Sequence, residues 1–145
     1  GRDREMLEQA ITENELTNLV VDGPYPPALA PEIADRSDVC LTLFRDLPVL
    51  HTCSPNKFFD SLAAGKPVVT NMTGWIASLV SDHECGYAVQ SGDAAGFAAR
   101  LIELKDNPNL VASMGENARA LAESQFSREV MFAKFEQVLS YAAEV

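Results

Sequence analysis

Apolar and polar residues alternate along the chain with two different spacings. Where apolar residues recur every three to four positions, they predict one buried face of a helix. Where a short run is mostly apolar and is bounded by turn residues, it predicts a buried strand. The predicted helices cover residues 4–15, 55–64, 75 to shortly before Gly86, 93–105, 109–123 and 128–143, with a further short helix opened by Pro31. The predicted strands cover residues 18–22, 38–44, 66–70 and 87–90.

The order of these elements predicts the fold class. Short apolar strands separated by helices form parallel sheets, because parallel strands need a crossover connection. We therefore expect an α/β fold, with a Rossmann-like parallel sheet flanked by helices. No internal repeat and no long linker divides the chain, so residues 1–145 are expected to form a single domain. Such sheets bind ligands beyond the carboxyl ends of their strands, which directs attention to the loops at 45–56 and 71–74.

Composition narrows the function classes. The 145 residues are 47% hydrophobic and 22% charged, which is enough to bury a core. The net charge of -10 repels nucleic-acid phosphates and anionic membrane surfaces, so the charge argues against a nucleic-acid partner. A small anionic ligand is still compatible with this charge where backbone amides and a few basic side chains meet. No stretch approaches the ~20 apolar residues that cross a bilayer.

The three cysteines give no metal or disulfide signal. Cys40, Cys53 and Cys85 are odd in number and far apart in sequence, so they match neither a Cys-x-x-Cys knuckle nor a disulfide framework. We interpret them as reduced thiols that serve as packing groups.

The start of the helix predicted at 55–64 is the most informative local feature. Ser54 is a favourable N-cap and Pro55 a favourable first helical residue, so free amides and the positive end of the helix dipole face outward, which favours a phosphate. Lys57, in the first turn, is mildly destabilising unless an anion is close, and Asp60 follows on the same face. By itself this pattern favours an ordinary amphipathic helix with a solvated face. The predicted polar face comprises Asn56, Lys57, Asp60 and Ser61, and the apolar face Phe58, Phe59, Leu62 and Ala63.

A longer series of motifs resembles one known family. The segment SPNKFFDSLAAGKPVV, at residues 54–69, is followed by TNMTGW, CGYAVQSGD and MGENARALAESQFS in the family's order. The chain is similar to the C-terminal, nucleotide-sugar-binding half of GT-B fold glycosyltransferases, within glycosyltransferase family 4 (glycosyl transferases group 1). The subgroup that builds bacterial capsule and O-antigen polysaccharides is the most similar. The likeness covers nearly the whole chain, and LAAGKPVV is its most specific element.

The resemblance implies roles for particular residues. Asp60 stands where the family has an acidic residue that hydrogen-bonds the nucleotide ribose, and the helix start at 54–57 faces the diphosphate. The family usually has a Glu-x7-Glu pair, but Thr52 stands at the first position. Gly1 resembles the last glycine of the family's Gly-x-Gly turn, so we expect the strand before that turn to be missing from the chain. The implied nucleotide-sugar site comprises Gly1, Ser54, Pro55, Asn56, Lys57, Asp60, Asn71, Thr73 and Gly74, with no catalytic residue or metal ligand assigned.

The function implied by the resemblance is sugar transfer. The chain would be the donor-binding domain, residues 1–145, of a larger retaining glycosyltransferase. The enzyme would take a sugar from a nucleotide-sugar, here expected to be a UDP-sugar, and pass it to a glycan or lipid-linked acceptor in bacterial surface polysaccharide synthesis, without a metal or other cofactor. Two alternatives on a similar fold are a non-catalytic Rossmann-like nucleotide-binding or regulatory module and half of a sugar-nucleotide epimerase.

The resemblance also implies a partner and a location. The partner is an N-terminal acceptor-binding domain of the same polypeptide, without which the fragment is not expected to be active. The terminal helix at 128–143 is expected to cross to that domain, as in this fold, or alternatively to dock on the sheet. We expect the enzyme in the cytoplasm, with the full-length protein at the inner face of the membrane.

Several residues near the predicted site have both a functional and a plain interpretation. His51 and Cys53 precede the helix and could contact a donor, or they could be ordinary loop residues. Backbone amides near Asn71, Thr73 and Gly74 could touch a uracil or a ribose, or could simply form a turn before the next helix.

Overall fold

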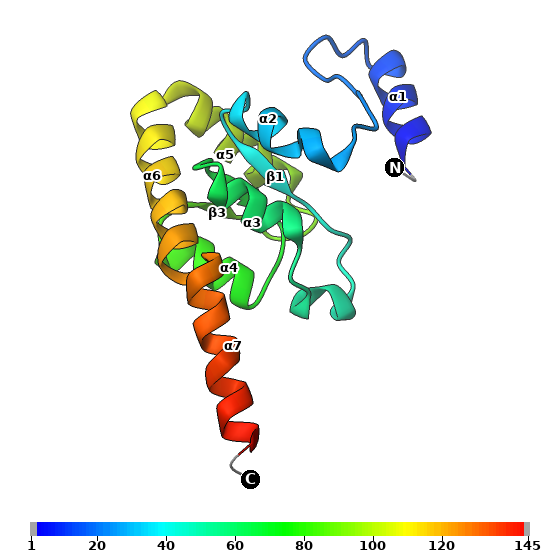
Figure 1. The fold of residues 1–145 in the computed structure, drawn as a ribbon. Coiled ribbons are helices and arrows are strands. Elements are labelled where there is room, and N and C mark those ends of the chain that lie inside the picture. Colours follow the sequence, from blue (N-terminus) through cyan, green and yellow to red (C-terminus); the bar gives the residue numbers. More distant parts are fainter. Residues whose placement is uncertain (1–2, 144–145) are drawn as a thin grey trace. The chain divides into compact units, whose positions relative to one another are not determined.

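The computed structural model describes residues 3–143. They fall into two compact units, one within residues 3–30 and one within residues 31–143. Each unit is described by itself. The labels of Figure 1 are used from here on.

The first unit contains the helix α1 (Arg4–Glu13) and the short 3-10 turn η1 (Pro27–Leu29). The Arg4 guanidinium donates hydrogen bonds to the carbonyl oxygens of Gly23 (2.7 Å) and Val21 (3.2 Å), which holds α1 against the following segment. The strand predicted at 18–22 is wrong, because those residues form no strand and Val20 is 81% exposed. An apolar run becomes a strand only where a neighbour pairs with it, and the described part of this unit supplies none.

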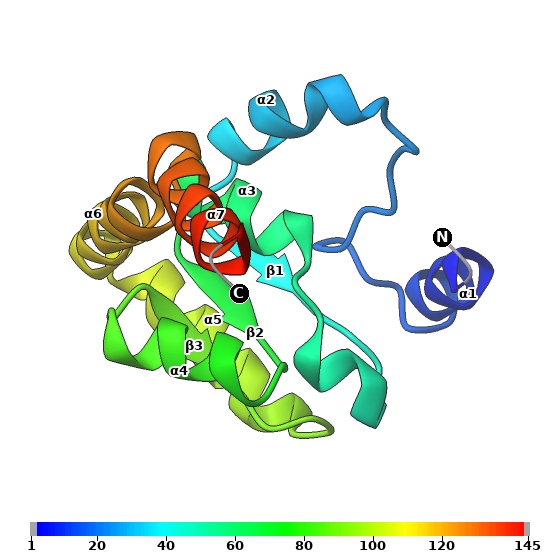
Figure 2. The same cartoon turned by 60° about the horizontal axis from the view of Figure 1, so that its bottom comes forward.

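The second unit is built on a three-stranded parallel sheet. Its strands are β1 (Cys40–Thr42), β2 (Val68–Thr70) and β3 (Gly86–Ala88), in the order β1-β2-β3 seen in Figure 2. The register places Cys40 beside Val68 and Val69 beside Tyr87. A Rossmann-like α/β sheet flanked by helices is therefore confirmed, with three strands in the described residues where four were predicted.

The described residues contain seven helices and two 3-10 turns in addition to the sheet. The predicted helices are confirmed to within about two residues at their ends, as is usual for helix boundaries. The predicted loop at 45–56 contains the 3-10 turn η2 (Pro48–Thr52). The remaining helices are α2 (Ala30–Asp35), α3 (Asn56–Ala63), α4 (Trp75–Asp82), α5 (Ala94–Asp106), α6 (Pro108–Gln125) and α7 (Arg128–Ala143).

Helices cover both faces of the sheet. Neighbouring residues of each strand point to opposite faces, so they pack against different helices. Val68 faces one core cluster, formed with α3, α4 and the second half of α6, whereas Val69 faces another, formed with α5 and the first half of α6. Both valines are fully buried. The first cluster comprises Phe58, Leu62, Val68, Met72, Ile76, Val80, Cys85, Ala118 and Leu121; the second comprises Val69, Leu104 and Met114.

The end of α3 packs closely on α6. Gly65 has a φ of 65°, the left-handed conformation that ends a helix without strain only at glycine, as the sequence predicts. At Gly115 on α6, an added Cβ would lie 2.5 Å from the Gly65 carbonyl oxygen. This contact therefore leaves no room for a side chain at Gly115.

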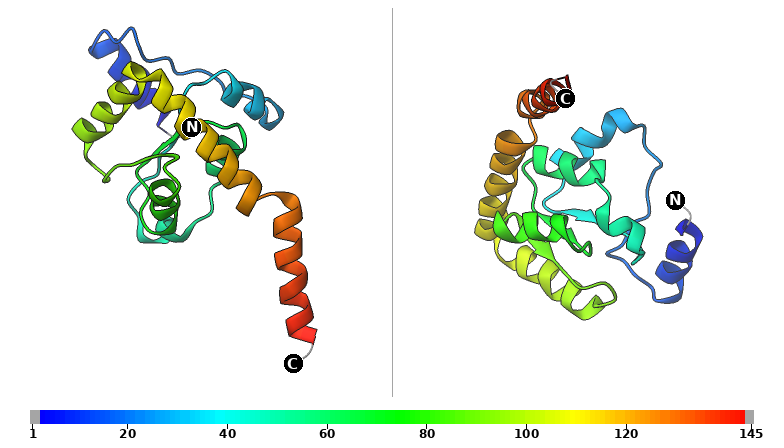
Figure 3. Two further views of the ribbon diagram at one scale, coloured as in Figure 1. Left: turned by 90° about the vertical axis from the view of Figure 1, so that its left-hand side faces the viewer. Right: turned by 90° about the horizontal axis from the view of Figure 1, so that it is seen from below.

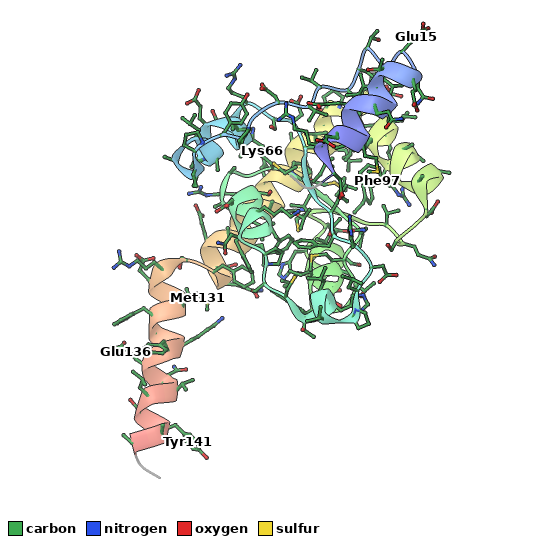
Figure 4. The ribbon with its side chains drawn as sticks, turned by 90° about the vertical axis from the view of Figure 1, so that its right-hand side faces the viewer. Glu15, Lys66, Phe97, Met131, Glu136 and Tyr141 are labelled. Carbon is green, nitrogen blue, oxygen red and sulfur yellow. The ribbon has the colours of Figure 1, made fainter. Side chains whose placement is uncertain are left out.

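The terminal helix α7 projects away from the sheet (Figures 1 and 3), and none of its residues is buried. Figure 4 shows Met131, Glu136 and Tyr141 spaced along it. The alternative that this helix docks on the sheet is therefore wrong. Within residues 3–143, no helix combines the length and the apolar character needed to cross a membrane.

Candidate functional site

The carboxyl ends of the three parallel strands lie at one edge of the sheet. Residues 43–55 follow β1, residues 71–74 follow β2 and residues 89–93 follow β3, and each connection leads into the start of a helix. Helix starts carry amides without intrahelical partners and a partial positive charge. This edge is therefore the part of the sheet best suited to an anionic ligand.

The first two connections are joined by one side chain. The Asn71 Oδ1 atom accepts a hydrogen bond from the Phe44 amide (2.9 Å), and the Asn71 Nδ2 atom donates to the Phe44 carbonyl oxygen (2.7 Å). Both ends of the amide are thus used by the protein backbone. Asn71 fixes the point at which the chain leaves β1, and its predicted contact with a nucleotide stays a prediction.

Two threonines at the ends of β1 and β2 make a second link beneath this edge. The Thr70 hydroxyl donates to the Thr42 carbonyl oxygen (2.7 Å) and accepts from the Met72 amide (3.1 Å). The Thr42 hydroxyl is fully buried and has no hydrogen-bond partner among the described residues. A buried hydroxyl without a partner carries a desolvation cost, so Thr42 is a local weakness of the core.

The predicted start of α3 is displaced by one residue. The helix begins at Asn56 and its N-cap is Pro55, not Ser54, with no side-chain capping bond. The Phe58 amide donates to the Pro55 carbonyl oxygen (3.0 Å), so the chain enters the helix through backbone contacts. Ser54 is exposed and Pro55 half-buried. The predicted capping role of Ser54 and first-turn role of Pro55 are therefore wrong, although the amides of the first turn remain available in principle to a ligand.

Lys57 is already engaged at the end of β1. Its Nζ atom donates to the Leu43 carbonyl oxygen (2.9 Å) and lies 4.2 Å from the centre of the Phe44 ring. Burial lowers the pKa of Lys57 below its ordinary value, and the nearby Cys53 opposes that shift. The carbonyl and the ring offset the charge of Lys57 without an anion, which removes the destabilisation expected from its place in the first turn.

The predicted polar face of α3 is only partly correct. Ser61 is 5% exposed, and its hydroxyl donates to the Lys57 carbonyl oxygen (2.6 Å). Ala63, predicted on the apolar face, is exposed. A serine can be buried on a helix when it bonds back to the carbonyl one turn earlier, which explains the exchange.

Asp60 is exposed and lines a pocket between α3 and the end of α6. The pocket has a volume of about 310 Å³, and its lining includes Phe59, Phe126 and Arg119. The Arg119 guanidinium donates to the Ala63 carbonyl oxygen (2.5 Å) and pairs with Glu123 (2.6 Å). Within residues 3–143, the Asp60 carboxylate has no hydrogen-bond or ion-pair partner, so it is open to a ligand's hydroxyl groups.

The turn η2 contacts the connection after β2. Gly74 has a φ of 67° and leads into α4, and an added Cβ there would lie 3.6 Å from the His51 carbonyl oxygen. The His51 Nε2 atom lies 2.9 Å from Asp46, which gives His51 a partner within its own loop. Thr73 is exposed beside Gly74. In the part of the chain that the structure describes, no three His, Cys, Asp or Glu side chains are grouped to hold a metal ion.

A smaller pocket opens at the same edge of the sheet. It has a volume of about 250 Å³ and is lined by residues from all three connections or their strands. Asp93 is part of its lining, and the Asp93 carboxylate accepts from the Gly96 amide (2.8 Å), which caps α5. The pocket lining comprises Leu43, Asn71, Val89, Gln90, Gly92, Asp93, Ala94 and Phe97.

Residues 55–121 match the family Glycosyl transferases group 1. The chain carries a group 1 glycosyltransferase domain. The matched part of this domain runs from the start of α3 through β2, α4, β3 and α5 into α6. It therefore includes both Lys57 and Asp60, together with the Asn71 connection.

Several curated relatives of the group 1 domain carry glycosyltransferase names. The D-inositol 3-phosphate glycosyltransferase of Streptomyces scabiei is 40% identical over 65 residues, or 45% of this chain and 15% of the relative. That of Thermomonospora curvata is 33% identical over 132 residues, or 83% of this chain and 28% of the relative. The capsular polysaccharide biosynthesis glycosyltransferase CapM of Staphylococcus aureus is 30% identical over 84 residues, or 57% of this chain and 22% of the relative. The chain thus spans less than a third of each of these relatives.

The structure brings together part of the predicted site of the group 1 domain. Lys57 and Asn71 both contact the backbone just after β1, whereas Asp60 lies one turn further along α3 toward α6. Gly1 lies outside the described residues. Two residues at this edge were missed from sequence. Phe44 donates one hydrogen bond to the Asn71 side chain and accepts the other, and nothing in a single sequence signals a bond between residues 27 apart. The sequence does not signal the unpartnered hydroxyl of Thr42, because threonine is common in strands.

Proposed function

We propose that this chain is the nucleotide-sugar-binding, C-terminal domain of a longer GT-B glycosyltransferase. The observation that carries the proposal is the arrangement of α3. Its first turn lies beside the end of β1, where Lys57 reaches the Leu43 carbonyl, and an unpartnered carboxylate, Asp60, follows within the next turn. Amide donors for a phosphate and a carboxylate that can accept from hydroxyl groups thus lie a few residues apart on one rigid helix.

In this proposal, the first-turn amides of α3 at Asn56 and Lys57 bind the diphosphate of the donor. They stabilise the negative charge that develops as the nucleoside diphosphate leaves, which is an electrostatic role. The Lys57 ammonium adds a positive charge at the same end of the helix. Asp60 accepts hydrogen bonds from the ribose hydroxyls. These roles are supported by the resemblance of Asp60 to the family's acidic residue and by the family match over 55–121.

The donor is proposed to be a UDP-sugar, transferred with retention of configuration to a glycan or lipid-linked acceptor of a bacterial surface polysaccharide. The capsular name of the Staphylococcus aureus relative supports the class of product. An N-terminal domain of the same polypeptide would bind the acceptor. The exposed apolar side chains of α7 are available to pack against such a domain.

Titration of the full-length protein with UDP and with GDP tests this assignment. Asp60→Ala should weaken UDP binding about ten-fold or more, because a hydrogen bond to a charged group contributes about 1.5–3 kcal/mol. Asp60→Asn retains an acceptor oxygen and should lose less. Glu116→Ala removes an exposed carboxylate of α6 and serves as the matched control.

The outcomes separate the parts of the proposal. If Asp60→Ala and Glu116→Ala bind UDP equally well, Asp60 does not contact the ribose. If GDP binds and UDP does not, the fold assignment stands and the choice of base is wrong. If the full-length protein binds a nucleotide but turns over no nucleotide-sugar with any acceptor, the non-catalytic nucleotide-binding module is favoured instead.

A further inference from the structure

The outer edge of β3 has no neighbouring strand among the described residues. The Val68 amide donates to the Cys85 carbonyl oxygen (3.0 Å), and the Val89 amide donates to the Thr70 carbonyl oxygen (2.8 Å). In a parallel strand, alternate residues direct both their N–H and C=O groups to the same neighbour. Cys85 and Val89 therefore face β2, and the groups of Gly86 and Ala88 face away from it.

A groove runs along this edge. It has a volume of about 700 Å³ and lies between α4, α6 and β3, which Figures 1 and 2 show close together. Gly86 and Ala88 both line it; Gly86 is buried and Ala88 is exposed. Its walls carry several small side chains, which leave space beside the strand. The lining comprises Ala77, Ser78, Ser81, Asp82, Glu84, Gly86, Tyr87, Ala88, Leu110, Ser113, Met114 and Asn117.

At the start of this edge, the Asn117 side chain donates to the Glu84 carbonyl oxygen (3.2 Å), while the strand itself lacks the usual protections against the addition of another strand. Natural edge strands are commonly protected by lysine, proline or a bulge, and none of these occurs at Gly86–Ala88. Adding a strand satisfies the outward amides and carbonyls by main-chain hydrogen bonds, while side-chain pockets select the sequence. The groove therefore fits an extended peptide better than a compact ligand.

The charge of the groove selects the kind of peptide. Asp82 and Glu84 are exposed acidic residues of its lining, and the lining contains no lysine or arginine. Arg100 stacks over the Tyr87 ring at 4.5 Å, but its charge is paired with Glu103 at 2.7 Å. A second copy of the chain would bring like charges together, at a net charge of -10 per copy.

We propose that the β3 groove binds an extended, basic segment of a partner polypeptide, which adds to the sheet beside Gly86–Ala88. The pairing covers a strand of three residues, so the interaction is weak and reversible. This surface is separate from the α3 site and does not depend on the nucleotide. It gives the domain a docking point for a protein partner.

The test uses the 145-residue chain and a capped peptide of alternating lysine and valine, followed by backbone amide NMR. We expect shift changes and slower hydrogen exchange at Gly86 and Ala88. A peptide of alternating lysine and proline has the same charge but lacks half of the amide donors, so it should not reproduce these changes. If both peptides act alike, the attraction is only electrostatic and the strand-addition proposal is wrong.

Two charge reversals locate the contact. Asp82→Lys places a base at the end of α4, where the helix dipole favours it, and should weaken binding of the lysine–valine peptide about two- to five-fold. Glu136→Lys makes the same change of charge on α7. It should change the affinity for the lysine–valine peptide only as far as the altered net charge of the protein does. Equal effects of the two variants, absence of binding at millimolar peptide, or self-association through Gly86 and Ala88 would each overturn the proposal.

Discussion

The Asn71 link between β1 and β2 makes a quantitative prediction. Asn71→Ala removes two hydrogen bonds of 2.9 and 2.7 Å and leaves the amide and carbonyl of Phe44 without their partner. Each bond contributes about 0.5–1.5 kcal/mol, and the site is only part-buried, so water can replace some of the loss. We expect the free energy of unfolding to fall by about 2 kcal/mol.

Asn71→Asp tests which half of the link matters. The carboxylate can still accept from the Phe44 amide, but it cannot donate to the Phe44 carbonyl and instead repels it. A protonated carboxyl can donate, so the folded state raises the pKa of the new group. Stability gained from the protonated form is present at low pH and is lost as the pH rises through that pKa. The cost of Asn71→Asp relative to wild type should therefore shrink as the pH is lowered.

Urea unfolding followed by circular dichroism gives the global cost, and hydrogen exchange of the Phe44 amide gives the local one. The matched control is Asn117→Ala, because the Asn117 side chain makes one longer bond, 3.2 Å, to the Glu84 carbonyl on an exposed surface. Its cost should be close to zero. If Asn71→Ala costs no more than Asn117→Ala, and Phe44 exchanges as in the wild type, the link does not stabilise the edge.

Two further predictions concern buried polar groups. Thr42→Val replaces an unpartnered hydroxyl with a methyl group of similar size, and should raise the free energy of unfolding by about 1 kcal/mol in urea unfolding; a loss of stability would mean that the hydroxyl has a partner in solution. Burial raises the pKa of the Cys85 thiol from 9.0 to about 11, so the unfolded chain ionises first, and stability complete below pH 9 should decline between pH 9 and 11. Cys85→Ala should remove that part of the pH dependence, and an unchanged decline would assign it to other groups.

The sequence predicts features that depend on neighbouring residues better than features that depend on distant ones. The helix α3 and the strand β2 are predictable because the apolar periodicity and the glycine that ends the helix, Gly65, are local signals. The run at 18–22 has the same local signal as β2, yet it lacks a pairing partner in its unit and forms no strand. The local sequence pattern does not show whether a distant segment pairs with the run.

The candidate site shows the same division. The position of α3 at the carboxyl edge follows from the order of strands and helices, so the sequence places Lys57 and Asp60 near that edge. Which groups they contact depends on segments far along the chain. Leu43 is 14 residues from Lys57, and Phe44 is 27 residues from Asn71. Ser61 was misplaced because its bond to the Lys57 carbonyl hides its polarity.

Both ends of α3 are tied to other elements. Lys57 holds its first turn to the Leu43 carbonyl, and Arg119 of α6 holds its last turn through the Ala63 carbonyl. A short helix fixed in this way has little conformational freedom left to lose. When a small anion binds at the start of α3, little free energy is lost in ordering the helix. The affinity for the anion therefore reflects its direct contacts with the protein. Loosening the tie from Arg119 should weaken binding without removing any contact to the ligand itself.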